Sequence, residues 1–490
     1  MCSSDLNELA AAQKCLGVCE AEAHALLAPI VASGATHDQI TERLRSSWSS
    51  FQRLRDTLAP LTEQQILAAP PLASAGAIDL DQLAAKLNAA LKIDTKSNND
   101  PALTGKILEA LALVALVMQR FRDAAQYFER AADAAKNDPA QAWRYQLQRA
   151  QALQELGCEF LDDEALQEAR VLYQTIVLPA VNETRDPQAW ATAQTKFGTL
   201  LGIQGQRQNG TRTLAESITA FENAVRAHDP KTHPLDWASA QNGLGNALGI
   251  LAHRQNDPDM LEAAVDAFDQ ALTKRSQDHT PWDWATTQNN LGSVLQSLGQ
   301  RKNDVQLLKR SVEAYKLVLL VWTRDRAPLH WATTFNNLGT ALRTLGEKRK
   351  GPRTLEQAVA AYRNALAERA RERVPQQWAM TQNNLGTALQ KLGERTEELQ
   401  HFNEAIAAYQ NALREWTQET VPITWAMTTA NLAIAQKSLA ERMQDPGTAG
   451  LALSNFEAVA KVFRSASHAQ YYEYATEQIA KTRELMRSLS

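Results

Sequence analysis

The chain has 490 residues, of which 44% are hydrophobic and 22% are charged, and its 51 basic and 55 acidic residues give a formal net charge of -4. This composition is typical of a folded protein, and the balanced charge provides no overall attraction to nucleic acid or to an anionic membrane. The four cysteines are too few for a disulfide framework. The N-terminal residues lack the basic and apolar regions of a secretory signal, and the longest apolar run, Ile107 to Met118, is too short to span a membrane. We therefore expect a cytoplasmic protein.

Residues 1–93 are predicted to form an N-terminal helical segment. Apolar residues recur at helical spacing in three stretches, Leu6 to Leu27, His37 to Leu58 and Asp79 to Leu91. A loop rich in Pro and Ala, residues 69–76, separates the second stretch from the third, and a polar break from Asp94 to Pro101 follows the third. This segment carries no catalytic motif, so we interpret it as a cap or a separate helical module.

A repeat of 47 residues organises the rest of the chain. The repeated tryptophans, spaced 47 apart, are Trp143, Trp190, Trp237, Trp284, Trp331, Trp378 and Trp425. The positions eight places after the last six of them are Gly198, Gly245, Gly292, Gly339, Gly386 and Ala433, and the aromatics 31 places after are Phe221, Phe268, Tyr315, Tyr362, Tyr409 and Phe456. Gly157 and Tyr173 are each one place out of phase, which indicates a small deletion inside the unit of Trp143 that is made good before Trp190. A fixed period of this length predicts a solenoid, in which each unit buries its apolar face against its neighbours.

Each clean repeat, within residues 187–420, is predicted to be a helix, a short turn and a second helix. A proline stands three residues before each tryptophan from Pro187 to Pro422, where it would open the first helix because the first turn needs no N–H donor there. The first helix of one unit then runs roughly from Trp284 to Arg301, and an apolar stripe marks the second helix. A charged amphipathic helix within residues 467–490 is the expected cap of the solenoid.

No pattern in the sequence predicts catalysis. The nine histidines form no metal-spaced pair, and Cys15 and Cys19 have no histidine or second cysteine pair nearby to complete a zinc site. A Gly-rich phosphate loop and a nucleophile elbow are both absent. We predict a protein that is not an enzyme and that needs no metal or cofactor.

In one repeat, the first helix carries Leu291, Gly292 and Leu295, and the second helix carries Ser311, Tyr315 and Val318. This repeat resembles the tetratricopeptide repeat. The resemblance covers about residues 101–463. Ordinary units of this family have 34 residues, and the extra 13 (47 minus 34) make these units most similar to the elongated repeats of kinesin light chains and bacterial signalling proteins. The resemblance implies an all-α, right-handed solenoid of seven or eight units, in which a small glycine lets the second helix approach the first and the aromatic fills the wedge between units.

The resemblance also implies a protein or peptide ligand in the concave groove. The Thr-Gln-Asn-Asn-Leu-Gly run is similar to the Asn-Asn-Leu-Ala run of kinesin light chains, whose asparagines hold the backbone of an extended peptide. Carried over by position, row one comprises Asn242, Asn289, Asn336 and Asn383, and row two comprises Asn290, Asn337, Asn384 and Asn431. A carboxamide offers a donor and an acceptor and so matches a peptide bond. The alternative is that these amides bridge neighbouring repeats as a structural series.

Other positions on the first helices invite weaker hypotheses. Arg343 and Lys391 lie where members of the family with a carboxylate clamp place cations. A basic row, which includes Arg207, Arg254 and Arg395, is predicted to complement helix dipoles, with an acid-binding row as the alternative. The tryptophans are predicted to be packing anchors, with a ligand platform as the alternative. As a second hypothesis, the resemblance to bacterial signalling proteins implies a sensor or regulatory subunit that grips a separate effector, such as a protease-like protein, partly through residues 1–93. Nucleic-acid binding is not expected.

Overall fold

The computed structural model describes residues 20–33, 37–63, 79–97, 100–466 and 468–489. Cys15, Cys19 and the predicted loop at 69–76 lie outside these ranges. The chain divides into two compact units, Met1–Thr287 and Gln288–Ser490, here called the N-terminal unit and the C-terminal unit. Their boundary falls within one helix of the repeats, and the division into 1–93, 101–463 and 467–490 remains a prediction.

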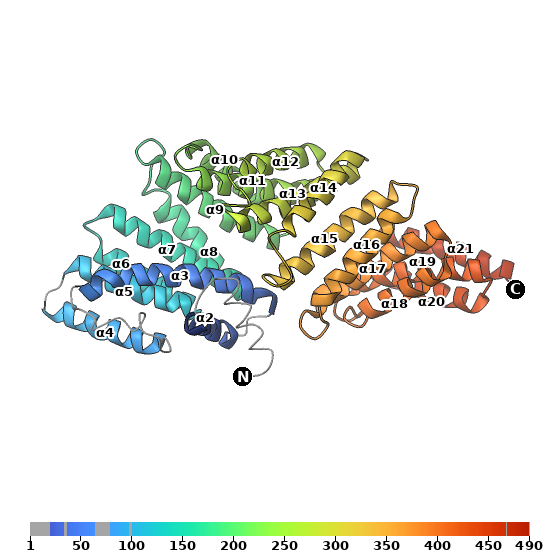
Figure 1. The fold of residues 1–490 in the computed structure, drawn as a ribbon, viewed down its shortest axis with the longest axis horizontal. Helices are drawn as coiled ribbons and strands as arrows, with labels where there is room; N and C mark the ends of the chain where they lie inside the picture. Colours follow the sequence, from blue (N-terminus) through green and yellow to red (C-terminus); the bar gives the residue numbers. More distant parts are fainter. Residues whose placement is uncertain (1–19, 34–36, 64–78, 98–99, 467, 490) are drawn as a thin grey trace. The chain divides into compact units, whose positions relative to one another are not determined.

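All the secondary structure of the described residues is helical, and from residue 101 onward the helices alternate as first and second members of pairs (Figure 1). The first helices, called A helices, are α5 (Pro101–Val117), α7 (Pro139–Glu159), α9 (Pro187–Arg207), α11 (Pro234–Gln255), α13 (Pro281–Arg301), α15 (Pro328–Glu347), α17 (Pro375–Thr396) and α19 (Pro422–Met443). The second helices, called B helices, are α6 (Phe121–Ala134), α8 (Asp163–Leu172, continued by η1, Tyr173–Val177), α10 (Arg212–Ala227), α12 (Pro258–Leu272), α14 (Val305–Val318), α16 (Arg353–Glu368), α18 (Leu399–Ala412) and α20 (Pro446–Ser465). The predicted all-α solenoid of helix pairs is confirmed.

The periodic prolines begin the A helices. Every A helix from α5 to α19 starts at a proline, which needs no N–H donor in the first turn and has its φ already set for a helix. The helix predicted from Trp284 therefore begins three residues earlier, at Pro281. The periodic tryptophans follow in the first turn and are half-buried, and the indole of Trp143 donates to the carbonyl of Val177 at 3.0 Å. These contacts agree with the predicted packing role.

The periodic glycines bring each A helix against the aromatic residue of its B helix. A Cβ atom on Gly386 would lie 2.8 Å from Cε1 of Tyr409, and one on Gly339 would lie 2.8 Å from Cε1 of Tyr362. Both tyrosines are fully buried. The close approach that the family resemblance implied is therefore present, and at these two positions it requires a residue without a side chain.

We expect Gly386→Ala to lower the free energy of unfolding of the C-terminal unit by about 1–3 kcal/mol, because the added methyl group overpacks a filled core. The single hydroxyl proton of Tyr409 is shared between Oγ1 of Thr387 and Oε1 of Gln390 on the A helix, and this contact restrains the ring from moving away. Chemical denaturation would measure the loss. Tyr409→Phe in the same background should restore part of it, since the ring is then free to shift. An unchanged stability of Gly386→Ala would contradict this account.

Two of the three N-terminal helices pack against the first A helix. The three helices are α2 (Glu20–Ala32), α3 (His37–Glu63) and α4 (Leu80–Ser97), of which α3 and α4 pack against α5. Helix α5 is apolar on nearly all sides because α3, α4 and α6 cover it, which accounts for the long apolar run in its sequence. The break predicted to begin at Asp94 was placed too early, because α4 continues to Ser97. The buried carboxylate of Asp94 accepts a hydrogen bond from Thr104 on α5.

The last helix, α21 (Ala469–Leu489), occupies the register of an A helix. It begins 47 residues after Pro422, and Tyr472 stands 47 residues after Trp425. It packs against α20 as α15, α17 and α19 pack against the B helices before them, and Tyr472 and Ile479 join the same apolar cluster as Phe463. The predicted charged helix is thus the first half of one further repeat. Within the described ranges, no helix is both long enough and apolar enough to cross a membrane.

Candidate functional site

The two rows of asparagines bridge consecutive A helices in the C-terminal unit. Row two donates to row one of the preceding repeat: Nδ2 of Asn337 lies 3.3 Å from Oδ1 of Asn289, and Nδ2 of Asn384 lies 3.1 Å from Oδ1 of Asn336. The next pair, Asn431 and Asn383, repeats this contact at 3.5 Å. The rows therefore form a structural series between repeats, which was the alternative interpretation of the sequence.

This series leaves hydrogen-bonding capacity in row two. Asn336 of row one is only 4% exposed, whereas Asn289 and Asn383 of row one are half-buried, as are Asn337, Asn384 and Asn431 of row two. A carboxamide has two donor hydrogens and an oxygen with two lone pairs, so the single bond that Asn384 donates to Asn336 uses a fraction of its capacity. The bonds to row one hold the row-two side chains in one orientation. The series can therefore serve as a support for ligand contacts as well as a link between repeats.

The remaining predicted asparagines lie at either side of the boundary between the units. Asn242 is half-buried on α11 of the N-terminal unit, and Asn290 is half-buried on α13 in the part that belongs to the C-terminal unit. In the repeat before that of Asn242, Thr195 and exposed Lys196 occupy the corresponding positions on α9. The asparagine pattern is thus complete only on α13, α15 and α17.

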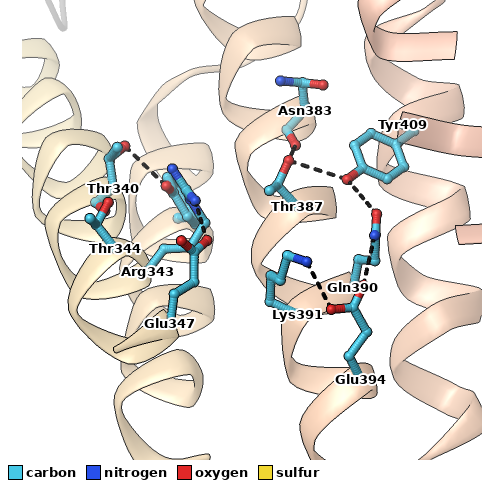
Figure 2. Close-up of polar contacts among 11 residues, drawn as sticks. Thr340, Arg343, Thr344, Glu347, Asn383, Thr387, Gln390, Lys391, Glu394 and Tyr409 are labelled. Carbon is cyan, nitrogen blue, oxygen red and sulfur yellow. Dashed lines mark hydrogen bonds and ion pairs between the residues drawn. The ribbon is translucent and has the colours of Figure 1, made fainter. Parts of the chain in front are cut away.

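Arg343 lies on α15 beyond the asparagines, and its charge is already paired. Its guanidinium forms an ion pair with Glu347 one turn on, as Figure 2 shows. It also lies beside the hydroxyl of Tyr362, whose pKa burial raises and Arg343 partly lowers. The protonated hydroxyl donates to Oγ1 of Thr340 at 3.0 Å. Arg343 therefore lies beside the hydroxyl of a buried tyrosine. This contact gives the cation at this position a structural role.

Lys391, the other candidate cation, lies on α17 in a similar network. Its Nζ is 2.8 Å from Oε2 of Glu394, and Gln390 donates to the other oxygen of the same carboxylate at 2.9 Å (Figure 2). Oε1 of Gln390 in turn lies 3.2 Å from the hydroxyl of Tyr409. The Lys391 side chain remains 40% exposed. Of the two predicted cations, Lys391 is the one that offers an accessible charge.

In two repeats, the residue 19 places before a buried tyrosine contacts its hydroxyl: Arg343 lies beside Tyr362 and Gln390 beside Tyr409. Tyr315 is hydrogen-bonded to Ser293 instead. The residue 19 places before each buried tyrosine is long and polar, whereas before two of the three phenylalanines it is glycine. The tyrosine pairs are Gln296 with Tyr315, Arg343 with Tyr362 and Gln390 with Tyr409, and the phenylalanine pairs are Gly202 with Phe221, Gly249 with Phe268 and Lys437 with Phe456. A buried hydroxyl requires a hydrogen-bond partner and a phenyl ring does not. This coupling was visible in the sequence but is not apparent from the A helices alone.

Two methionines add an apolar surface next to row two. Met380 is 37% exposed and Met427 is 45% exposed, and each lies one turn before a row-two asparagine, Asn384 or Asn431. Methionine is flexible and polarisable, so it adapts to apolar groups of different shapes. We call the surface formed by Asn337, Thr340, Met380, Asn384, Thr387, Lys391, Met427 and Asn431 the asparagine face.

A buried arginine, which the sequence interpretation missed, links successive A helices. Arg369 follows α16 and is 2% exposed. Its Nη1 donates to Oγ1 of Thr381 on α17 at 2.7 Å, and its Nη2 donates to Oγ1 of Thr333 on α15 at 2.9 Å. Arg275 makes the corresponding contacts in the N-terminal unit, where burial lowers its pKa. Each arginine therefore fixes the spacing between two A helices.

Tryptophan replaces this arginine in alternate repeats. Positions 275, 322, 369 and 416, spaced 47 apart, hold Arg, Trp, Arg and Trp, and all four side chains are buried. The Nε1 of Trp416 donates to Oε1 of Gln376 at 2.9 Å. Because the two residue types differ in chemistry, the row does not stand out as a motif although its spacing is regular.

The basic row contacts the preceding repeat. Arg254 donates to the carbonyl of Gln206 at 3.1 Å and to that of Gly210 at 2.6 Å, and Arg207 donates to the carbonyl of Gly157 at 2.9 Å. Gln206 and Gly157 lie in the last turns of α9 and α7, whose carbonyls carry the negative end of the helix dipole. These arginines therefore complement a helix dipole, as predicted. The dipole belongs to the A helix of the preceding repeat and not to the helix that carries the arginine.

Comparison with known proteins gives one family match. Residues 284–320 and 378–414 match the family model of the tetratricopeptide repeat. Each matched segment runs from a periodic tryptophan through the following B helix. No curated protein matches the chain.

Several solved structures resemble the chain. The C-terminal part of a TPR repeat-containing protein from Cytophaga hutchinsonii is 13% identical, with 62% of this chain and 93% of that chain covered and a TM-score of 0.37. BtubC from P. vanneervenii is 18% identical, with 56% and 92% covered and a TM-score of 0.33. A Rap protein complexed with competence and sporulation factor is 11% identical, with 76% and 98% covered and a TM-score of 0.40.

Proposed function

We propose that this chain, which is a tetratricopeptide repeat protein, acts as an interaction scaffold and binds an extended protein segment along the asparagine face. The observation that carries the proposal is the arrangement of row two. Half-buried Asn337, Asn384 and Asn431 recur at one place on successive A helices, and each keeps free hydrogen-bonding capacity while row one holds its orientation. Such amides suit the main chain of a peptide, whose donors and acceptors also recur at a regular spacing.

The neighbouring side chains would select among peptides. Met380 and Met427 offer an apolar surface one turn from the asparagines, and Lys391 offers a charge that a ligand carboxylate could share with Glu394. In this proposal Arg343 has no direct role, because it supports Tyr362 and pairs with Glu347. We therefore expect ligands with an apolar residue and an acidic residue in a chain that is otherwise recognised through its backbone.

Peptides selected from a random display library against the full chain would provide the probe. We expect Asn384→Ala with Asn431→Ala to weaken binding of a selected, labelled peptide roughly thirty-fold, because the loss of two hydrogen bonds costs about 2 kcal/mol. Fluorescence anisotropy would measure the change. Peptides N-methylated at single main-chain positions should lose affinity at alternating sites if the backbone is what the asparagines bind.

The matched control is Asn364→Ala with Asn403→Ala, which removes two exposed asparagines from the B helices α16 and α18. This control should bind the peptide as the parent chain does. Thermal denaturation of both double variants would separate a loss of binding from a loss of stability. If the selected peptides bind the Asn384/Asn431 variant with unchanged affinity, the two rows serve only to connect the repeats.

A further inference from the structure

Helix α3 is fastened to the A helices of the first two repeats. The buried guanidinium of Arg43 pairs with the carboxylate of Glu159 at the end of α7, and its Nη2 donates to the carbonyl of the same residue at 3.0 Å. Farther along α3, Ser47 accepts a hydrogen bond from Gln119 at 3.0 Å. The apolar side of α3, which includes Phe51 and Leu54, is buried in the core of the N-terminal unit. Contacts along the helix thus hold α3 in place.

The surface that α3 faces corresponds in register to the asparagine face. Lys196 and Thr199 on α9 stand six and nine places after Trp190, as Asn337 and Thr340 stand after Trp331. On α7, Gln148, Gln151 and Glu155 take the same register once the one-residue deletion in this repeat is counted. In the N-terminal unit, therefore, the chain's own helix lies along the surface that the C-terminal unit leaves accessible.

A pocket of about 380 Å³ remains between α3, α7 and α9. Its size is within the range of small-molecule sites. The polar lining residues are Ser46, Ser49, Ser50 and Arg53 from α3, Gln148, Gln151, Gln154 and Glu155 from α7, and Lys196 and Thr199 from α9. Leu116, Phe121, Phe128 and Ala152 supply the apolar part of the lining. The pocket thus combines an apolar surface with hydroxyl and carboxamide groups.

The charges of the lining favour an anion. Arg53 on α3 and Lys196 on α9 bring two cations, against the single carboxylate of Glu155. Arg53 keeps 40% of its side chain exposed, and its partner Glu109 is 3.9 Å away, which is a loose ion pair. Lys196 is exposed and forms no ion pair with any described residue. A ligand carboxylate could therefore contact either cation without breaking a tight pair.

Two of the lining glutamines are incompletely satisfied. Oε1 of Gln148 and Oε1 of Gln154 are buried and accept no hydrogen bond from the described residues. Buried polar atoms without a partner are uncommon in native proteins and call for an explanation. Both atoms are hydrogen-bond acceptors, so a donor group on a ligand, separate from any carboxylate, would provide one.

We propose that this pocket binds a small organic carboxylate with an apolar body. The carboxylate would lie between Arg53 and Lys196, the apolar part would contact Phe128 and its neighbours, and the serine and glutamine groups would bind further polar atoms. A discrete molecule fits better than a continuous peptide, because α3 occupies the surface along which an extended chain would have to continue. This site does not depend on peptide binding in the C-terminal unit.

Saturation-transfer NMR on the full chain would test the proposal with hexanoate and 3-phenylpropionate as probes and their primary amides as neutral counterparts. We expect saturable binding of the acids, at least tenfold tighter than that of the amides. Lys196→Gln should weaken binding of the acids about tenfold, and Ser49→Trp, which fills the pocket from an exposed wall position, should abolish it. Both residues are exposed, so these variants should fold.

Lys274→Gln is the matched control, because Lys274 is an exposed lysine just after α12 and lies outside the pocket. Its affinity for the acids should equal that of the parent chain. The proposal is overturned if neither acid binds, if acids and amides bind equally well, or if binding persists in the Ser49→Trp variant. None of these results would affect the test with displayed peptides.

Discussion

Glu159→Met is expected to reduce the protection of α3 amides from hydrogen exchange by about two orders of magnitude. Arg43 is 3% exposed and Glu159 17%, so the substitution takes a carboxylate away from a buried guanidinium. Removing one partner of a buried pair costs about 3–5 kcal/mol. We expect the lower end of this free-energy range, because Arg43 still donates hydrogen bonds to Oγ of Ser33 at 2.8 Å and to the carbonyl of residue 159. A loss of about 3 kcal/mol corresponds to roughly a hundredfold change in an opening equilibrium.

Hydrogen exchange read by mass spectrometry resolves this effect by segment, which matters because a solenoid need not unfold in one step. The loss should be confined to α3 and the ends of α5 and α7 that it contacts. Glu168→Met is the matched control: Glu168 pairs with Arg122 at 2.8 Å, but both side chains are over 40% exposed, so the change should be within about 1 kcal/mol. Equal effects of the two variants would show that Glu159 does not hold α3 in place.

The repeat architecture could be predicted because each element is specified locally and then copied. Proline at the start of an A helix, and the pairing of Gly386 with Tyr409, follow from backbone geometry and side-chain volume at a fixed spacing. Six copies of the pattern turn a weak local preference into a strong one. The same reasoning placed the asparagines on the A helices, where the structure has them.

The directions of side chains and the contacts outside the repeat could not be predicted in the same way. The family resemblance implied that the asparagine rows hold a peptide, with a series that bridges repeats as the alternative. Sequence spacing could not decide between the two, because the contact from Asn384 to Asn336 depends on the rotation between neighbouring A helices. The docking of α3 joins Arg43 to Glu159 across 116 residues and is not repeated elsewhere. A single long-range contact of this kind leaves no periodic signal.

Buried Arg369 could not be predicted because tryptophan takes its place in alternate repeats, and this alternation provides a matched control for its hydrogen bond to Thr381. We expect Thr381→Val to lower the free energy of unfolding of the C-terminal unit by about 1.5–3 kcal/mol, because it removes the hydroxyl that accepts from buried Arg369 at 2.7 Å, and hydrogen bonds to charged groups are worth that much. Thr428 is the natural control: it has the same register and is also buried, but Trp416 stands in place of the arginine. Thr428→Val should therefore cost less than about 1 kcal/mol, since no charge depends on it. Denaturant titrations of the two variants would measure the difference, and equal losses would mean that the guanidinium does not rely on the threonine. The comparison separates the contribution of a charged hydrogen bond from that of packing, because one chain supplies both versions of the same contact.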